Sequence, residues 1–141
     1  MKKNVIRIVS LLVLLSVIIS TVAFAAENSS AYIASTGAYV TKSGSNIKVY
    51  FQITGKNFMD KIGTTYIYLY ENNGNSWSLV KTFDSTDSTY TSAMISTNSS
   101  AKSSHVTYTL GDSSKYYYAV VHFYAERNGG SDTIIQDTPA A

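Results

Sequence analysis

Hydrophobic and polar residues alternate with a period of two along several stretches of the chain, a pattern typical of β-strands buried on one side. Ile47–Thr54 shows it most clearly, and Lys115–Arg127 repeats it over a longer run rich in aromatic and β-branched residues. The predicted inward side chains are Ile47, Val49, Phe51 and Ile53 in the first stretch, and Tyr117, Ala119, Val121, Phe123 and Ala125 in the second. Both stretches are therefore predicted to be half-buried strands.

Further stretches with strand character are separated by turn-forming residues. They are Ala31–Lys42, Thr64–Glu71, Ser76–Phe83, His105–Leu110 and Ser131–Asp137. Turns are predicted at Ser43–Asn46, at Asn72–Asn75 and at Asn128–Gly130, and the last two contain the Asn-Gly pair that suits tight hairpins. The strands follow one another at intervals of about 8–12 residues without any helical period, which predicts an antiparallel sandwich or barrel.

Two stretches are predicted to be loops. Gly55–Gly63 is bounded by glycines but contains three large apolar residues. These residues are Phe58, Met59 and Ile62. They are expected to plug the end of the sandwich, and a hydrophobic binding tip is the alternative. Asp84–Ser104 is rich in Ser, Thr and Asp, with one short strand expected at Met94 and Ile95. A loop of this length is either mobile or functional, and the sequence leaves both open.

The run Tyr108–Tyr117, followed by Val121 and Ala125, resembles the corner that leads into the penultimate strand of fibronectin-III and immunoglobulin-like domains. A tyrosine packs at that corner, and the resemblance gives this role to Tyr117 or Tyr116. It implies an all-β fold, namely an antiparallel immunoglobulin-like (Greek-key) β-sandwich of seven or eight strands.

A second resemblance covers roughly Ala31–Ile134. It rests on Phe58–Gly63, Ser76–Thr82, Val106–Tyr108, Tyr117–Ala125 and Gly129–Asp132. These segments are similar to those of a family of small secreted proteins from Gram-positive bacteria, whose function is unknown. The resemblance implies export and a β-sandwich, but it implies no activity and no site residues.

The N-terminus has the pattern of a signal peptide. Basic residues in Met1–Arg7 precede the apolar run Ile8–Val22, and Ala23–Ala25 places small residues where signal peptidase cleaves. The apolar run has about 15 residues, against the ~20 of a membrane-spanning helix, so cleavage is favoured over an uncleaved anchor. We therefore expect a signal peptide at 1–25, a flexible start at 26–30, one sandwich domain at 31–138 and a tail at 139–141.

Composition narrows the classes of function. Lys2, Lys3 and Arg7 precede residue 26, so eight of the eleven basic residues remain against nine acidic ones, a formal charge of −1. A near-neutral domain lacks the basic surface that binds nucleic acid. The chain has no cysteine, which excludes disulfides, thiolate metal sites and lipidated cysteine. After cleavage of the signal peptide, no integral membrane segment is expected, and the sequence shows no wall-sorting signal. The protein is therefore predicted to be secreted or loosely associated with the cell envelope.

Catalytic and metal-binding patterns are sparse. His105 and His122 are the two histidines, and neither lies in a spacing that serves hydrolysis or metal binding. Asp84 and Asp87, approached by Asp132 or Asp137, could bind calcium, but solvated turn aspartates are the favoured interpretation. The sequence therefore predicts no enzyme, no cofactor and no metal, and a secreted hydrolase is the least favoured alternative.

Tyrosine is the unusual feature of the composition, with twelve residues. In an immunoglobulin-like topology Thr64–Glu71 neighbours Lys115–Arg127, so their outward rings would share one face. The candidate ligand-binding residues are Tyr66, Tyr68, Tyr70, Tyr116, Tyr118, His122 and Tyr124, with Trp77 at the margin. Such a face suits a surface glycan or protein. The alternatives are that the tyrosines only stabilise the sheet, or that the face mediates self-association in a structural protein.

Overall fold

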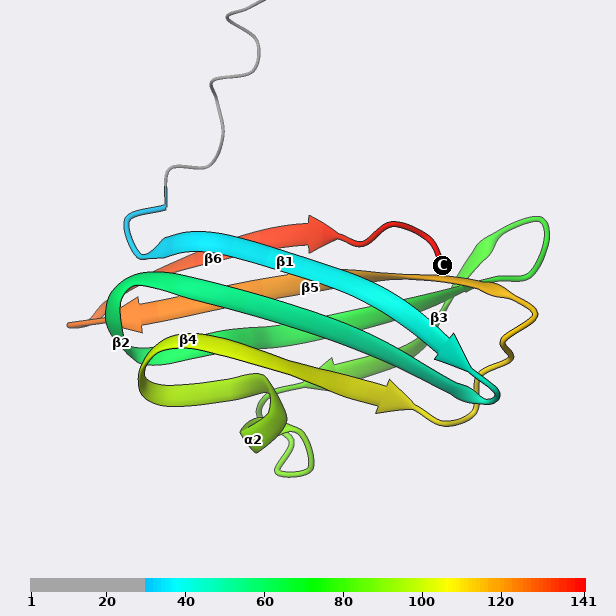
Figure 1. The fold of residues 1–141 in the computed structure, drawn as a ribbon, viewed down its shortest axis with the longest axis horizontal. Coiled ribbons are helices and arrows are strands. Elements are labelled where there is room, and N and C mark those ends of the chain that lie inside the picture. The colour runs from blue at the N-terminus through cyan, green and yellow to red at the C-terminus, as the bar shows by residue number, and fades with distance from the viewer. Residues whose placement is uncertain (1–29) are drawn as a thin grey trace, which may run out of the picture.

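The computed structural model describes residues 30–141, most of which lie in β-strands (Figure 1). The strands are β1 (Ile33–Ser43), β2 (Asn46–Asn72), β3 (Trp77–Asp84), β4 (Ile95–Tyr108), β5 (Tyr116–Arg127) and β6 (Gly130–Asp137). All six belong to one antiparallel sheet. The prediction of an all-β antiparallel fold is confirmed, although the strands number six rather than seven or eight. The predicted signal peptide lies outside the described residues, and no helix within 30–141 is long and apolar enough to cross a membrane.

The strand count differs because two predicted strands and the loop between them form the single 27-residue strand β2. Its first half pairs with β1 and β4, and its second half pairs with β3 and β5. The predicted loop Gly55–Gly63 is extended here, because Met59–Gly63 finds backbone partners in β4. Shifts in pairing register at Thr54/Met59 and at Thr64/Tyr66 are the irregularities at which a strand bends. Figure 1 shows β2 turning back at one end of the molecule.

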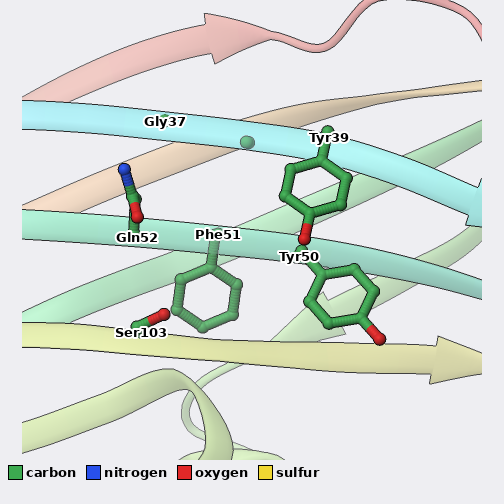
Figure 2. A pocket seen from close by; sticks show the side chains of 7 residues that line it. Gly37, Tyr39, Tyr50, Phe51, Gln52 and Ser103 are labelled. Carbon is green, nitrogen blue, oxygen red and sulfur yellow. The ribbon is translucent and has the colours of Figure 1, made fainter.

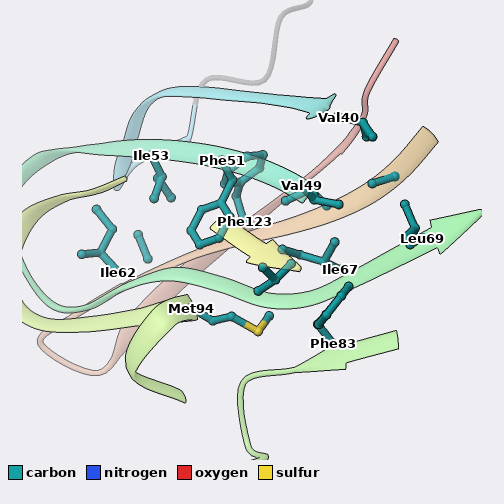
Figure 3. Close-up of a cluster of buried hydrophobic side chains, with 14 of the residues drawn as sticks. Val40, Val49, Phe51, Ile53, Ile62, Ile67, Leu69, Phe83, Met94 and Phe123 are labelled. Atoms are coloured by element: carbon teal, nitrogen blue, oxygen red, sulfur yellow. The ribbon is translucent and has the colours of Figure 1, made fainter. Parts of the chain in front are cut away.

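The bend curls the sheet around one hydrophobic core, so that the inward sides of the two halves of β2 face each other (Figure 3). The predicted inward residues of Ile47–Thr54 and Lys115–Arg127 are all buried. Met59 and Ile62 are buried as well, as expected of residues that fill the end of the core. Phe58 is 71% exposed, so the hydrophobic tip that was the alternative for this stretch consists of that one ring.

The prediction of a long loop at Asp84–Ser104 is wrong for its second half. The chain makes turns after β3, forms one helical turn, α2 (Thr91–Met94), and continues as the 14-residue strand β4. Residues 95–104 are polar and lie mostly at the surface, so they lack the apolar alternation by which a strand is recognised. They form a strand nevertheless because β2 supplies pairing partners for most of them.

Both ends of the described chain are tied to the sheet. Asp132 in β6 accepts hydrogen bonds from the Ser30 hydroxyl at 2.6 Å and the Ala31 amide at 2.7 Å. These bonds hold the pKa of the Asp132 carboxyl below its ordinary value. Ala141, in the predicted tail, exchanges two backbone hydrogen bonds with Tyr117 at the start of β5. The two ends of the described chain are therefore held against β6 and β5.

Candidate functional site

The predicted pairing of the two tyrosine-rich strands is confirmed. In the register of β2 with β5, Tyr66 pairs with His122 and Tyr70 pairs with Tyr118. These side chains alternate with the buried Ile67 and are partly accessible to solvent, so they point away from the core. We call the outward side of β3, the second half of β2, β5 and β6 the tyrosine face.

Six of the eight predicted site residues form two groups of rings in contact. The Tyr70 and Tyr118 rings stack with their centroids 4.9 Å apart, and Trp77 of β3 meets Tyr118 edge-on at 4.8 Å. His122 lies edge-on to Tyr66 at 6.1 Å and to Tyr68 at 5.3 Å. Pairs in such geometry contribute about 0.5–1.5 kcal/mol each beyond the area they bury. The rings therefore hold one another in place.

The other two predicted residues lie apart from these groups. Tyr116 is exposed at the start of β5, with the Lys42 ammonium 5.1 Å from the centre of its ring. The Tyr124 hydroxyl donates to the Glu126 carboxylate at 2.6 Å, and this bond is the main reason that the pKa of Tyr124 is raised. Neither of these two rings belongs to the groups of rings around Tyr118 and His122.

Two residues of the tyrosine face were missed by sequence reasoning. Leu79 pairs with Tyr70 and is 50% exposed, and Ile135 pairs with His122 and is 59% exposed. Ile135 could have been found, since an inward Ile134 places its neighbour outward. Leu79 could not, because the register of β3 shifts between its pairs with Leu69 and Tyr70.

The face is largely aromatic, with a few acidic groups among its rings. Asp84 and Asp137, which pair with Tyr66 and Val120, lie at the ends of their strands. Burial is the main cause that raises the pKa of the Tyr118 hydroxyl, so this phenol stays protonated and neutral well into the alkaline range. The face offers hydroxyl donors and ring edges together with one carboxylate. Asp137 pairs with Val120, which lies between Tyr118 and His122, and the charge of Asp137 adds to the rise in the pKa of Tyr118.

A buried polar group supports one end of the tyrosine face. The Tyr117 hydroxyl donates to Glu71 Oε2 at 2.5 Å and accepts from the backbone amide of Asp112 at 2.8 Å. Lys115 Nζ donates to the other carboxylate oxygen, Glu71 Oε1, at 2.6 Å. Because Glu71 and Tyr117 each adjoin a stacked tyrosine in sequence, this group fixes the backbone under Tyr70 and Tyr118. Of the two tyrosines that the resemblance named, Tyr117 is buried and Tyr116 is exposed, and the role of Glu71 was not predicted.

A second aromatic row lies on the outward side of β1, the first half of β2 and β4. Tyr39, Tyr50 and His105 are direct neighbours across the three strands, and the two tyrosine rings stack at 5.0 Å. Beside this row lies a shallow hollow of about 310 Å³ (Figure 2). It is lined by Gly37, Ala38, Tyr39, Tyr50, Phe51, Gln52 and Ser103. Sequence reasoning missed the hollow, although the hairpin turn predicted at Ser43–Asn46 sets the register that brings Tyr39 to Tyr50.

The two histidines lie in separate places, His105 beside Tyr50 and His122 beside Tyr66. Within residues 30–141 no group of three or more His, Asp or Glu side chains could hold a metal ion. Asp84 and Asp87 instead accept hydrogen bonds from residues two positions further along, Thr86 and Thr89. Such bonds are typical of aspartates that stabilise turns.

Comparison with known proteins gives little to add. No protein-family model matches the chain, and no curated protein matches it. Among solved structures, the fold has a likeness to Spo0M, a sporulation control protein from Bacillus subtilis, with 9% identity and a TM-score of 0.42. The match covers 75% of this chain and 48% of that protein, so the chain spans about half of its length. The resemblance to small secreted Gram-positive proteins therefore rests only on the segments quoted above.

Proposed function

We propose that the protein is a secreted, non-enzymatic binding module that recognises a protein at the cell surface through the tyrosine face. One observation carries the proposal. The face gathers two groups of aromatic rings together with the exposed Leu79 and Ile135, which no part of residues 30–141 covers. An apolar patch that remains uncovered is typical of an interaction site.

The composition of the face fits a protein partner better than a glycan. Protein interfaces are enriched in tyrosine and tryptophan, and the energy of binding is concentrated in such rings. A glycan partner is therefore kept as an outcome of the test below.

The proposal includes an immunoglobulin-like arrangement of the strands. Counting the two halves of β2 separately gives seven strands, grouped as β1, first half of β2 and β4 against β3, second half of β2, β5 and β6. The bond from the Asp112 amide to the Tyr117 hydroxyl supports it, because a tyrosine corner makes the same bond to backbone a few residues upstream. The basic, apolar and Ala23–Ala25 segments support export.

Tyr118→Ala is expected to weaken binding to isolated cell envelopes of the producing organism by about tenfold or more, because central aromatic residues dominate interface energetics. Tyr118 contacts both Tyr70 and Trp77, so its removal opens the middle of the patch. Co-sedimentation of the protein with the envelopes measures the effect. Phe58→Ala is the control, because it also removes an aromatic ring, and this ring is 71% exposed and lies outside the contacts of the face.

The envelopes are tested before and after protease treatment. A protein receptor predicts that protease abolishes sedimentation. Sedimentation that survives protease and is lost in Tyr118→Ala would replace the protein partner by a glycan. Equal sedimentation of Tyr118→Ala and the unchanged chain, with circular dichroism showing both folded, would remove the tyrosine face from the proposal.

Self-association in a structural protein is a second candidate, favoured by the exposure of Leu79 and Ile135 on the same face. Two flat apolar faces can pack together in a symmetric pair. Light scattering as a function of concentration is expected to show dimers or larger species that Ile135→Glu disperses. A monomer at every concentration would eliminate this candidate.

A further inference from the structure

The hollow on the outward side of β1, the first half of β2 and β4 combines aromatic and polar walls. Figure 2 shows the rings of Tyr39 and Tyr50 on one side, seen broadside, and Gln52 and Ser103 with Gly37 on the other. The strand register explains this arrangement, since Gly37, Gln52 and Ser103 form the row next to the aromatic one. Because Gly37 has no side chain, this row leaves space beside the rings.

We propose that this hollow binds a single neutral sugar ring. The apolar face of a sugar packs on a phenol ring, and Tyr39 is 55% exposed and therefore accessible. The hydroxyl groups of a sugar need donors and acceptors, which the Gln52 amide and the Ser103 hydroxyl supply. A volume of about 310 Å³ lies at the lower end of the ~300–1,000 Å³ of small-molecule sites, which suits one ring rather than several.

The walls also determine which ligands are disfavoured. None of the residues that line the hollow is charged, so nothing there compensates the desolvation of a charged ligand. A purely apolar ligand would displace water from the exposed amide of Gln52 and offer no hydrogen bond in return. A neutral molecule with one apolar face and several hydroxyl groups meets both conditions.

This site is independent of the tyrosine face. Tyr39 and Tyr50 belong to β1 and the first half of β2, whereas Tyr70 and Tyr118 belong to the second half of β2 and to β5. Loss of one site therefore need not affect the other. The protein would hold a sugar at one surface and a protein at another.

Binding is tested with the full chain and with glucose, galactose, mannose and N-acetylglucosamine as probes. Saturation-transfer NMR identifies the bound sugar, and titration gives its dissociation constant. At least one of these sugars is expected to bind, and glucuronate and the acyclic sorbitol are expected to bind at least about tenfold more weakly. Failure of all four neutral sugars, or equal binding of sorbitol, overturns the proposal.

Two variants locate the bound sugar. Tyr39→Ala removes the stacking ring, and Gly37→Val fills the space beside it, since a Cβ at Gly37 would meet Gln52 Nε2 at an acceptable 3.4 Å. Each is expected to weaken binding by about tenfold or more, while Phe58→Ala, which lies outside the hollow, leaves it unchanged. Unchanged binding in both variants, with native circular dichroism, would place the sugar elsewhere and refute the proposal. Envelope binding through Tyr118 is measured separately, so the two proposals can fail independently.

Discussion

Gly63→Ala is expected to prevent folding, or to lower the free energy of unfolding by more than about 4 kcal/mol, the range of the most damaging single substitutions. Gly63 lies in β2 with φ +154°, a conformation that residues with side chains rarely adopt. A Cβ there would lie 1.9 Å from the carbonyl oxygen of Met94, at the end of α2. Relief requires the backbone of Met94 or of β2 to move, and both line the core. Urea unfolding followed by circular dichroism measures the change.

Gly44→Ala is the control for this prediction. Gly44 also has positive φ, +60°, but a Cβ there would meet nothing within 4 Å. It lies in a two-residue hairpin turn, where a side chain costs about 1–2 kcal/mol from the left-handed conformation alone. If the two variants unfold at the same urea concentration, the close approach of β2 to α2 is not what requires glycine at position 63.

The alternation of apolar and polar residues predicted the strands that have one apolar side, because the side chains on that side are the ones buried in the core. Ile47–Thr54 and Lys115–Arg127 therefore match the structure residue by residue. The continuity of β2 was not predicted, since two glycines between two alternating runs also fit a loop. In Thr64–Glu71, alternation places Thr65 on the same side as Ile67 and Leu69. The structure buries Thr64 instead, because the shift in pairing between Thr64 and Tyr66 reverses the alternation there.

The polar half of β4 shows what alternation cannot reveal. Its residues 95–104 form a strand because of their partners in β2, and a partner far along the chain leaves no mark in the local sequence. The intrinsic conformational preference of these residues opposes a strand, since serine and asparagine favour turns. Tertiary pairing overrides that preference, as it often does in sheets.

The tyrosine face was predicted because its rings lie on two strands whose faces could be counted by twos. The hollow beside Tyr39 was not, because it depends on three strands and on the absence of a side chain at Gly37. The buried contact of Glu71 with Tyr117 also joins residues far apart in sequence. A group of side chains on one face of a strand can thus be predicted from the sequence. A hollow between strands, or a hydrogen bond between residues far apart in the chain, can be found only in the structure.

Tyr117→Phe is expected to lower the free energy of unfolding near pH 7 by about 1.5–3 kcal/mol, the range for a hydrogen bond to a charged group. The substitution keeps the buried ring but removes the hydroxyl between Glu71 and the Asp112 amide. Tyr124→Phe is the matched control, because its hydroxyl also bonds a carboxylate but at the partly exposed Glu126. Chemical unfolding of both variants is compared with that of the unchanged chain.

The dependence on pH identifies the mechanism. The bonds from Lys115 and Tyr117 hold the pKa of Glu71 below its ordinary 4.5, so Glu71 stabilises the fold above that pH and this contribution is lost as the pH falls through the lowered pKa. Burial and the bond to Glu71 raise the pKa of Tyr117 from 10.0 to about 12, so its contribution is complete below pH 10.0 and is lost as the pH rises toward 12. The difference between Tyr117→Phe and the unchanged chain should therefore narrow above pH 10 and also in acid below about pH 4.5. A difference that stays constant from pH 3 to pH 11 would show that the substitution acts through packing, and that the hydroxyl does not stabilise the corner under the tyrosine face.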